Sequence, residues 1–108
     1  MIMTQTITTK AENWVDDLAT FTLYADGSFV YQEEFYKILH SNVADEFNDG
    51  GKYDIFTSKW VNETYGEYSA FKFNDTKYWE STAPNMDDFS REAKTPQEAI
   101  VKILAATT

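Results

Sequence analysis

The sequence contains no cysteine, which excludes disulfide bonds, thiolate catalysis and cysteine-ligated metal sites. It has only four glycines and two prolines, and no glycine- or proline-rich linker divides the chain. No segment repeats at a period of about 20–50 residues. We therefore expect a single domain over residues 1–108, with residues 1–10 forming an edge strand or a frayed arm.

Long apolar segments are also absent. No stretch reaches the ~20 apolar residues of a membrane-spanning helix. The start, Met1 to Gln5, lacks the basic and apolar regions of a secretory signal peptide. These observations predict a cytoplasmic protein.

Positive charge is scarce. The sequence has nine basic residues, of which Arg91 is the single arginine, and 18 acidic residues, so the formal net charge is −9. Such a surface repels polyanions, so direct binding to nucleic acids or to anionic membranes is disfavoured. The acidity instead favours a basic protein as partner.

The segment from Ala19 to Tyr31 predicts a β-hairpin. A three-residue loop, Ala25-Asp26-Gly27, would place Leu23 opposite Phe29 and Phe21 opposite Tyr31, which gathers the large apolar side chains on one face. Gly27 then occupies the loop position that requires a left-handed backbone. Upstream, the spacing of Trp14 and Leu18 predicts one or two helical turns within residues 11–18.

The middle of the chain combines a helical pattern with strand-like segments. Apolar residues four apart, at 35, 39, 43 and 47, predict a helix over residues 33–47. The aromatic and β-branched content of residues 53–61, 68–73 and 77–79 predicts a three-stranded antiparallel meander. Residues 81–94 read as an irregular connection.

The clearest local signal is Thr95-Pro96-Gln97-Glu98, which matches a capping box with proline at the first helical position. An amphipathic helix should follow. Together the elements predict an α+β domain: an antiparallel sheet of about five strands, made of a hairpin, a helix and a three-stranded meander, with the C-terminal amphipathic helix packed on one face.

Candidate catalytic and metal-binding groups have simpler explanations. His40 is the only histidine, and nothing in the sequence supplies it with an oriented partner. Residues 45–50 resemble the start of a calcium loop, but Phe47 and Phe56 occupy positions where ligands are required. Adjacent acid pairs diverge on helices and strands. We therefore expect no catalytic residue, no cofactor and no metal site.

The remaining acidic and aromatic residues suggest a binding surface. One sheet face cannot hide all 18 aromatic rings, and tyrosine and tryptophan commonly anchor protein interfaces. The residues that we expect to contact a partner are Asp45, Glu46, Asp49, Asp54, Glu63, Tyr65, Glu67, Asp87 and Asp88. The predicted function is a non-enzymatic, acidic protein-binding module.

In size, charge, absence of cysteine and compactness, the chain resembles the small acidic inhibitors that phages carry against host defence, such as anti-CRISPR proteins and other DNA mimics. The resemblance implies an inhibitor that acts in the host cytoplasm and occupies the basic nucleic-acid-binding surface of a partner protein.

Two alternatives stay open. The residues from Thr20 to Tyr31 and from Thr95 to Leu104 are similar to HicB-like antitoxin domains, which implies a structural or assembly subunit that forms a homo-oligomer. The other alternative is a hydrolase that uses scattered carboxylates.

Overall fold

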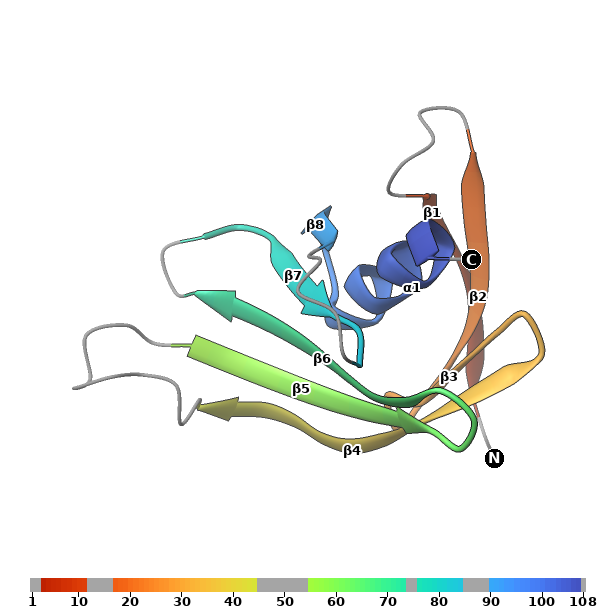
Figure 1. Cartoon of the computed structure of the whole chain (residues 1–108), viewed down its shortest axis with the longest axis horizontal. Coiled ribbons are helices and arrows are strands. Elements are labelled where there is room, and N and C mark those ends of the chain that lie inside the picture. The colour runs from red at the N-terminus through yellow and green to blue at the C-terminus, as the bar shows by residue number, and fades with distance from the viewer. Residues whose placement is uncertain (1–2, 12–16, 45–54, 74–75, 85–89, 108) are drawn as a thin grey trace.

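A computed structural model describes residues 3–11, 17–44, 55–73, 76–84 and 90–107. The protein is mostly β: eight antiparallel strands follow one another in chain order, and the curled sheet forms a half-barrel on which the C-terminal helix packs (Figure 1). The strands are β1 (Thr4–Lys10), β2 (Leu18–Tyr24), β3 (Phe29–Tyr31), β4 (Glu34–Ala44), β5 (Ile55–Asn62), β6 (Gly66–Phe73), β7 (Trp79–Thr82) and β8 (Ser90–Ala93), and the helix is α1 (Pro96–Thr107).

The N-terminal part of the sheet confirms the predicted hairpin. β1 is an edge strand, and Leu23 of β2 pairs with Phe29 of β3. Gly27 has a φ of 97°, so the loop does need a residue that tolerates the left-handed region. The helical turns expected over residues 11–18 fall largely outside the described residues, and Leu18 belongs to β2.

The predicted helix over residues 33–47 is wrong, because β4 occupies most of this segment and pairs with both β3 and β5. Phe35 and Leu39 are about half exposed, whereas Tyr36 between them is buried. The four-residue spacing of the apolar residues was therefore misleading, since the strand alternation that buries Tyr36 sets the inward face. Pairing on both sides overrides the local helical pattern.

The C-terminal part of the sheet contains more strands than expected. β5, β6 and β7 form the predicted meander, with Trp60 opposite Tyr68. Residues 81–94 are not wholly irregular, because β7 extends to Thr82 and β8 pairs with it. The sheet thus has eight strands where about five were expected, and a single helix where two were expected, within the described residues.

Helix α1 begins as predicted. The Glu98 amide donates to Thr95 Oγ1 at 3.2 Å, which is the first half of the capping box. The Glu98 carboxylate instead accepts a hydrogen bond from Thr9 Oγ1 of β1 at 3.4 Å, so it connects the helix start to the sheet edge. No helix among the described residues is long and apolar enough to cross a lipid bilayer.

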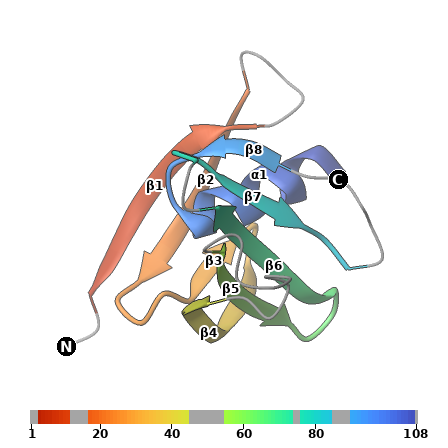
Figure 2. The ribbon, with the colours of Figure 1, turned by 90° about the vertical axis from the view of Figure 1, so that its left-hand side faces the viewer.

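The core lies between α1 and the concave face of the sheet. The helix contacts β6, β7 and β8 on one side and β1 and β2 on the other, as the two perpendicular ribbon views show (Figures 1 and 2). Trp60, Phe29 and Ile100 are fully buried there. The Trp60 indole donates to the Gly27 carbonyl at 2.8 Å, which joins the centre of the core to the β2–β3 loop.

Candidate functional site

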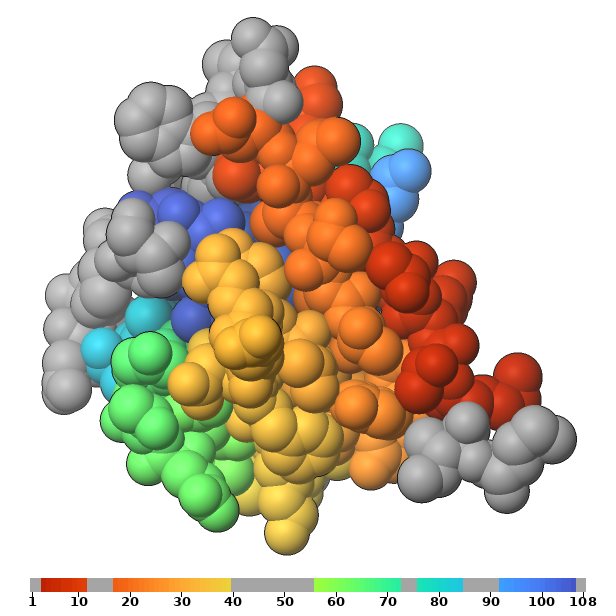
Figure 3. All heavy atoms as spheres, turned by 90° about the vertical axis from the view of Figure 1, so that its right-hand side faces the viewer, coloured from red at the N-terminus to blue at the C-terminus, as the bar shows by residue number. Residues whose placement is uncertain are grey.

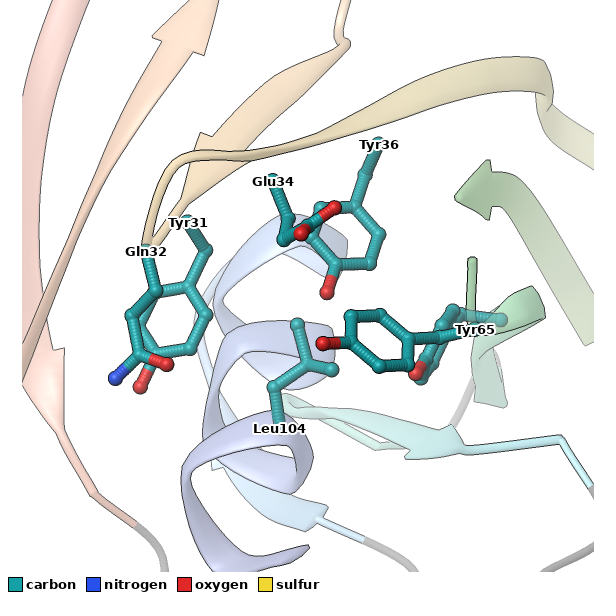
Figure 4. Close-up of a pocket in the computed structure, with 7 residues that line it drawn as sticks. Tyr31, Gln32, Glu34, Tyr36, Tyr65 and Leu104 are labelled. Carbon is teal, nitrogen blue, oxygen red and sulfur yellow. The ribbon is translucent and has the colours of Figure 1, made fainter. Parts of the chain in front are cut away.

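A cavity of about 230 Å³ opens at one end of the half-barrel. Its lining consists of four tyrosines, two further polar side chains and one leucine from the helix: Tyr31, Gln32, Glu34, Tyr36, Tyr65, Tyr68 and Leu104 (Figure 4). Pockets for drug-sized ligands measure about 300–1,000 Å³. This tyrosine pocket therefore has room for one side chain or a small molecule of similar size.

The β3–β4 hairpin supplies one wall of the tyrosine pocket. Tyr31 pairs with Glu34, so only Gln32 and Glu33 form the turn between the strands. Their φ values are 50° and 67°, as a type I′ turn requires. Non-glycine residues rarely adopt this region, and each such residue costs about 1–3 kcal/mol. The turn that borders the pocket is therefore strained.

The β5–β6 turn supplies the opposite wall and is fixed to the hairpin by Asn62, which is 3% exposed. Asn62 Nδ2 donates to the Glu34 carboxylate and to the Phe35 carbonyl, both at 3.1 Å. Asn62 Oδ1 accepts from the backbone amides of Thr64 at 2.8 Å and Tyr65 at 2.9 Å. Figure 3 shows the hairpin (gold) and the turn (green) side by side on the surface. One buried amide thus holds both walls together.

Stacked aromatic rings support the pocket from the core side. The Tyr36 ring stacks on Phe29 with centroids 4.8 Å apart and meets Tyr68 edge-on at 5.5 Å. Phe29 in turn contacts Trp60 edge-on at 6.1 Å. Such ring pairs contribute about 0.5–1.5 kcal/mol each beyond their buried area. The inner tyrosines are therefore held by packing.

Three phenols of the pocket have raised pKa values. Burial raises the pKa of Tyr36 well above its usual range, and the nearby Tyr68 and Glu34 raise the same pKa further. Burial also raises the pKa of Tyr31 and of Tyr68. A charged phenolate is disfavoured where water is excluded and where a carboxylate is close. At neutral pH these groups are hydroxyls that can both donate and accept hydrogen bonds.

Acidic residues lie in the pocket lining and in the two turns that border it. Glu33 and Glu63 are exposed in the two turns, and Glu34 lines the cavity. Glu67 follows the second turn and pairs with Lys59 at 3.7 Å. No basic residue lines the cavity among the residues that the structure describes. The pocket and its rim therefore carry negative charge.

Three of the residues predicted to bind a partner lie in or directly after the β5–β6 turn. Glu63, Tyr65 and Glu67 belong to the β5–β6 turn or to the start of β6, and Tyr65 lines the cavity. The other six lie outside the described residues: Asp45, Glu46, Asp49, Asp54, Asp87 and Asp88.

Most of the pocket lining was not foreseen from the sequence. The helix predicted over residues 33–47 separated the β3–β4 hairpin from the meander, so the sequence analysis did not predict Tyr31, Glu34 and Tyr36 as site residues. The available signal was Tyr31-Gln32-Glu33-Glu34-Phe35-Tyr36, in which tyrosines flank a polar turn on one strand face. Without glycine or asparagine, that turn lacks the usual hairpin signature.

Other candidate sites receive no support within the described residues. No group of three or more histidine or acidic side chains is arranged to hold a metal ion in that part of the chain. The loop that resembles a calcium site, residues 45–50, lies outside it, and so does the side chain of His40. Glu34 is the one carboxylate in the described lining, whereas glycoside hydrolysis needs two.

Comparison of the chain with protein-family models, with curated proteins and with solved structures finds no significant match. A function for this protein therefore has to be inferred from its geometry and charge.

Proposed function

We propose that this protein is a non-enzymatic, acidic binding module that occupies the basic nucleic-acid-binding surface of a partner protein, in the manner of a DNA-mimic inhibitor. The observation that supports this most is the acidic rim of the tyrosine pocket, where Glu33 and Glu63 are exposed in the two turns and Glu34 lines the cavity. Carboxylates on a folded surface can take the places of nucleic-acid phosphates.

The described ranges contain nine acidic and eight basic residues, so most of the acidic excess of the full sequence comes from residues outside them. Lys59 and Glu67 form an ion pair, with the lysine nitrogen and the carboxylate oxygen 3.7 Å apart. Glu33 and Glu63 are exposed in the two turns beside the pocket, where a partner can reach them. A formal charge of −9 would also speed association with a basic protein, and this acceleration declines as salt is added.

The test is affinity capture from a nuclease-treated bacterial lysate, followed by purification of the captured protein. We expect a basic nucleic-acid-binding protein whose affinity for this chain falls steeply with salt. We further expect nucleic acid and this chain to compete for that protein. Binding that is insensitive to salt, or a captured protein that still binds its nucleic acid, would contradict the proposal.

Two matched variants test whether the rim is the contact surface. Glu33→Gln/Glu63→Gln removes two exposed acids from the rim, and Asp17→Asn/Glu92→Gln removes two exposed acids elsewhere. Both lower the net negative charge equally. The rim variant should weaken binding at least tenfold more than its control. Equal weakening would mean that net charge, and not the rim, determines the affinity.

A second candidate function is assembly into a homo-oligomer. It is favoured by β1, a seven-residue edge strand that pairs with β2 on one side only. An open strand edge is a template for pairing with another chain. Light scattering separates the two functions, because a stable oligomer that retains no basic partner would favour assembly.

A further inference from the structure

The tyrosine pocket presents mainly oxygen atoms to a ligand. Figure 4 shows side chains from the β3–β4 hairpin and from the β5–β6 turn converging above Leu104 of α1. The lining offers four phenol oxygens, the Glu34 carboxylate and the Gln32 amide. Leu104 and the tyrosine rings supply apolar contact. A complementary ligand is therefore rich in N–H donors and flat or slender in shape.

Charge decides between cationic, neutral and anionic ligands. Glu34 lies in the lining, and Glu33 and Glu63 flank it on the exposed turns. Phosphate or carboxylate groups would be repelled here. The Glu34 carboxylate accepts one hydrogen bond from Asn62, and a carboxylate can accept about four. Acceptor capacity thus remains for a cation.

The aromatic walls favour the same ligand class. Cations bind the electron-rich faces and hydroxyls of tyrosine, and this attraction strengthens where water is excluded. Among biological cations, the arginine guanidinium is planar, stacks on aromatic rings and carries five N–H donors. A single arginine side chain also suits a cavity of about 230 Å³, which is below the range for larger ligands.

We propose that the tyrosine pocket is a receptor for one arginine side chain, with Glu34 pairing with the guanidinium and Tyr31, Tyr36 and Tyr65 contacting it. The source of this arginine rests on the proposed function: it is an arginine that the basic partner otherwise uses to hold nucleic acid. The pocket then gives the interface a defined anchor, to which the surrounding acids add attraction at longer range.

The first test uses the intact protein and the short peptide acetyl-Gly-Arg-Gly-amide, followed by NMR. We expect saturable shifts at the β3–β4 hairpin and the β5–β6 turn, with a Kd on the order of 1 mM, as is typical of a single side chain. The same peptide with citrulline, which has the shape of arginine without its charge, should bind at least tenfold more weakly. Equal binding of the citrulline peptide, or shifts located elsewhere, would overturn the proposal.

Variants define the roles of individual residues. Glu34→Gln keeps an oxygen for Asn62 and removes the charge, so we expect at least a tenfold loss of affinity for the arginine peptide. Tyr65→Ala changes an exposed turn residue and should also weaken binding without affecting folding. The control is Glu92→Gln, which removes one exposed acid from β8 and should leave the affinity within twofold.

The outcomes for the pocket and for the proposed function are distinguishable. If the arginine peptide does not bind but the whole protein still captures a basic partner in a salt-dependent manner, the pocket proposal fails and the function stands. If the peptide binds the pocket but no nucleic-acid-binding protein is captured, the function fails and the arginine site stands.

Discussion

The side chain of Asn62 donates a hydrogen bond to the Glu34 carboxylate across 3.1 Å, which joins two hairpins that are 28 residues apart in the chain. The same amide group also bonds to the Phe35 carbonyl and to two backbone amides of the β5–β6 turn. Its hydrogen-bonding capacity is therefore fully used. Asn62 fixes the distance between the two walls of the tyrosine pocket.

Replacing Asn62 should be costly. Asn62→Ala removes four hydrogen bonds from a buried position and leaves the Phe35 carbonyl without this donor. We expect the free energy of unfolding to fall by about 2–4 kcal/mol. Urea denaturation measures this change. Thr64→Ala is the control, because the backbone amide of Thr64 still bonds to Asn62, and a loss as large as that of Asn62→Ala would contradict the role given to the asparagine.

The Asn62→Asp variant gives this contact a pH dependence. It keeps an acceptor for the Thr64 and Tyr65 amides but places a second carboxylate beside Glu34. Two close carboxylates cannot both ionise without repulsion, so one is protonated more readily in the folded state. The destabilisation should thus grow as pH rises from about 4 to 7 and shrink as pH falls. A constant difference from the wild type, measured by urea denaturation across this range, would contradict the contact.

Gly27 provides a test of the core beneath the site. Its φ of 97° is unfavourable for other residues, and a Cβ atom there would lie 2.8 Å from Ile38 Cδ1. We expect Gly27→Ala to lower the free energy of unfolding by about 1–3 kcal/mol. Ile38→Val removes the clashing methyl group, so the double variant should be more stable than the sum of the two single changes predicts. If the effects of the two substitutions on the free energy of unfolding are strictly additive, the cost of Gly27→Ala comes from the backbone conformation alone and not from the contact with Ile38.

The sequence predicted those parts of the fold that local chemistry determines. The register of Leu23 with Phe29 followed from burying large side chains around a Gly27 loop, and the start of α1 followed from Thr95 and Pro96. β4 was missed because its outward residues, Phe35 and Leu39, happen to lie four apart. Only pairing with β3 and β5 shows which of its faces is buried.

The tyrosine pocket was harder to predict for the same reason. Tyr36 and Tyr65 are 29 positions apart, and they meet because β4 and β5 are paired and Asn62 joins their ends. When β4 is predicted to be a helix, its pairing with β5 is not predicted, and neither is the proximity of Tyr36 and Tyr65. The sequence could suggest Glu63, Tyr65 and Glu67 as candidate binding residues, since they lie close together around one predicted loop and have acidic or aromatic side chains.

The buried tyrosines predict a loss of stability at alkaline pH. The pKa of Tyr36 is raised in the folded protein, so the unfolded chain ionises first, near pH 10.0. Stability is therefore unaffected by this group at lower pH and falls as pH rises above about 10. Tyr36→Phe should lessen this loss by up to about 1.4 kcal/mol per pH unit. Tyr78→Phe, which changes an exposed tyrosine, should not, and equal slopes for the two variants would contradict the burial of the phenol.

The strained β3–β4 turn predicts a substitution that stabilises the fold and weakens the site. Glu33 has a φ of 67° at the second position of the turn, where glycine is preferred. Glu33→Gly should raise the free energy of unfolding by about 1 kcal/mol, or Tm by about 4–8 °C. Glu63→Gly is the control, because Glu63 has no positive φ, and glycine there should leave Tm unchanged or lower.

Binding measurements on the same two variants separate strain from charge. Each removes one acid from the rim of the tyrosine pocket, so both should weaken the salt-dependent attraction to a basic partner, while only Glu33→Gly raises Tm. Because both variants lose one carboxylate, only a larger loss of affinity for Glu33→Gly than for Glu63→Gly would link the strained backbone at Glu33 to binding. A Glu33→Gly variant that is stabilised but retains full affinity would instead show that the rim acid at this position is dispensable.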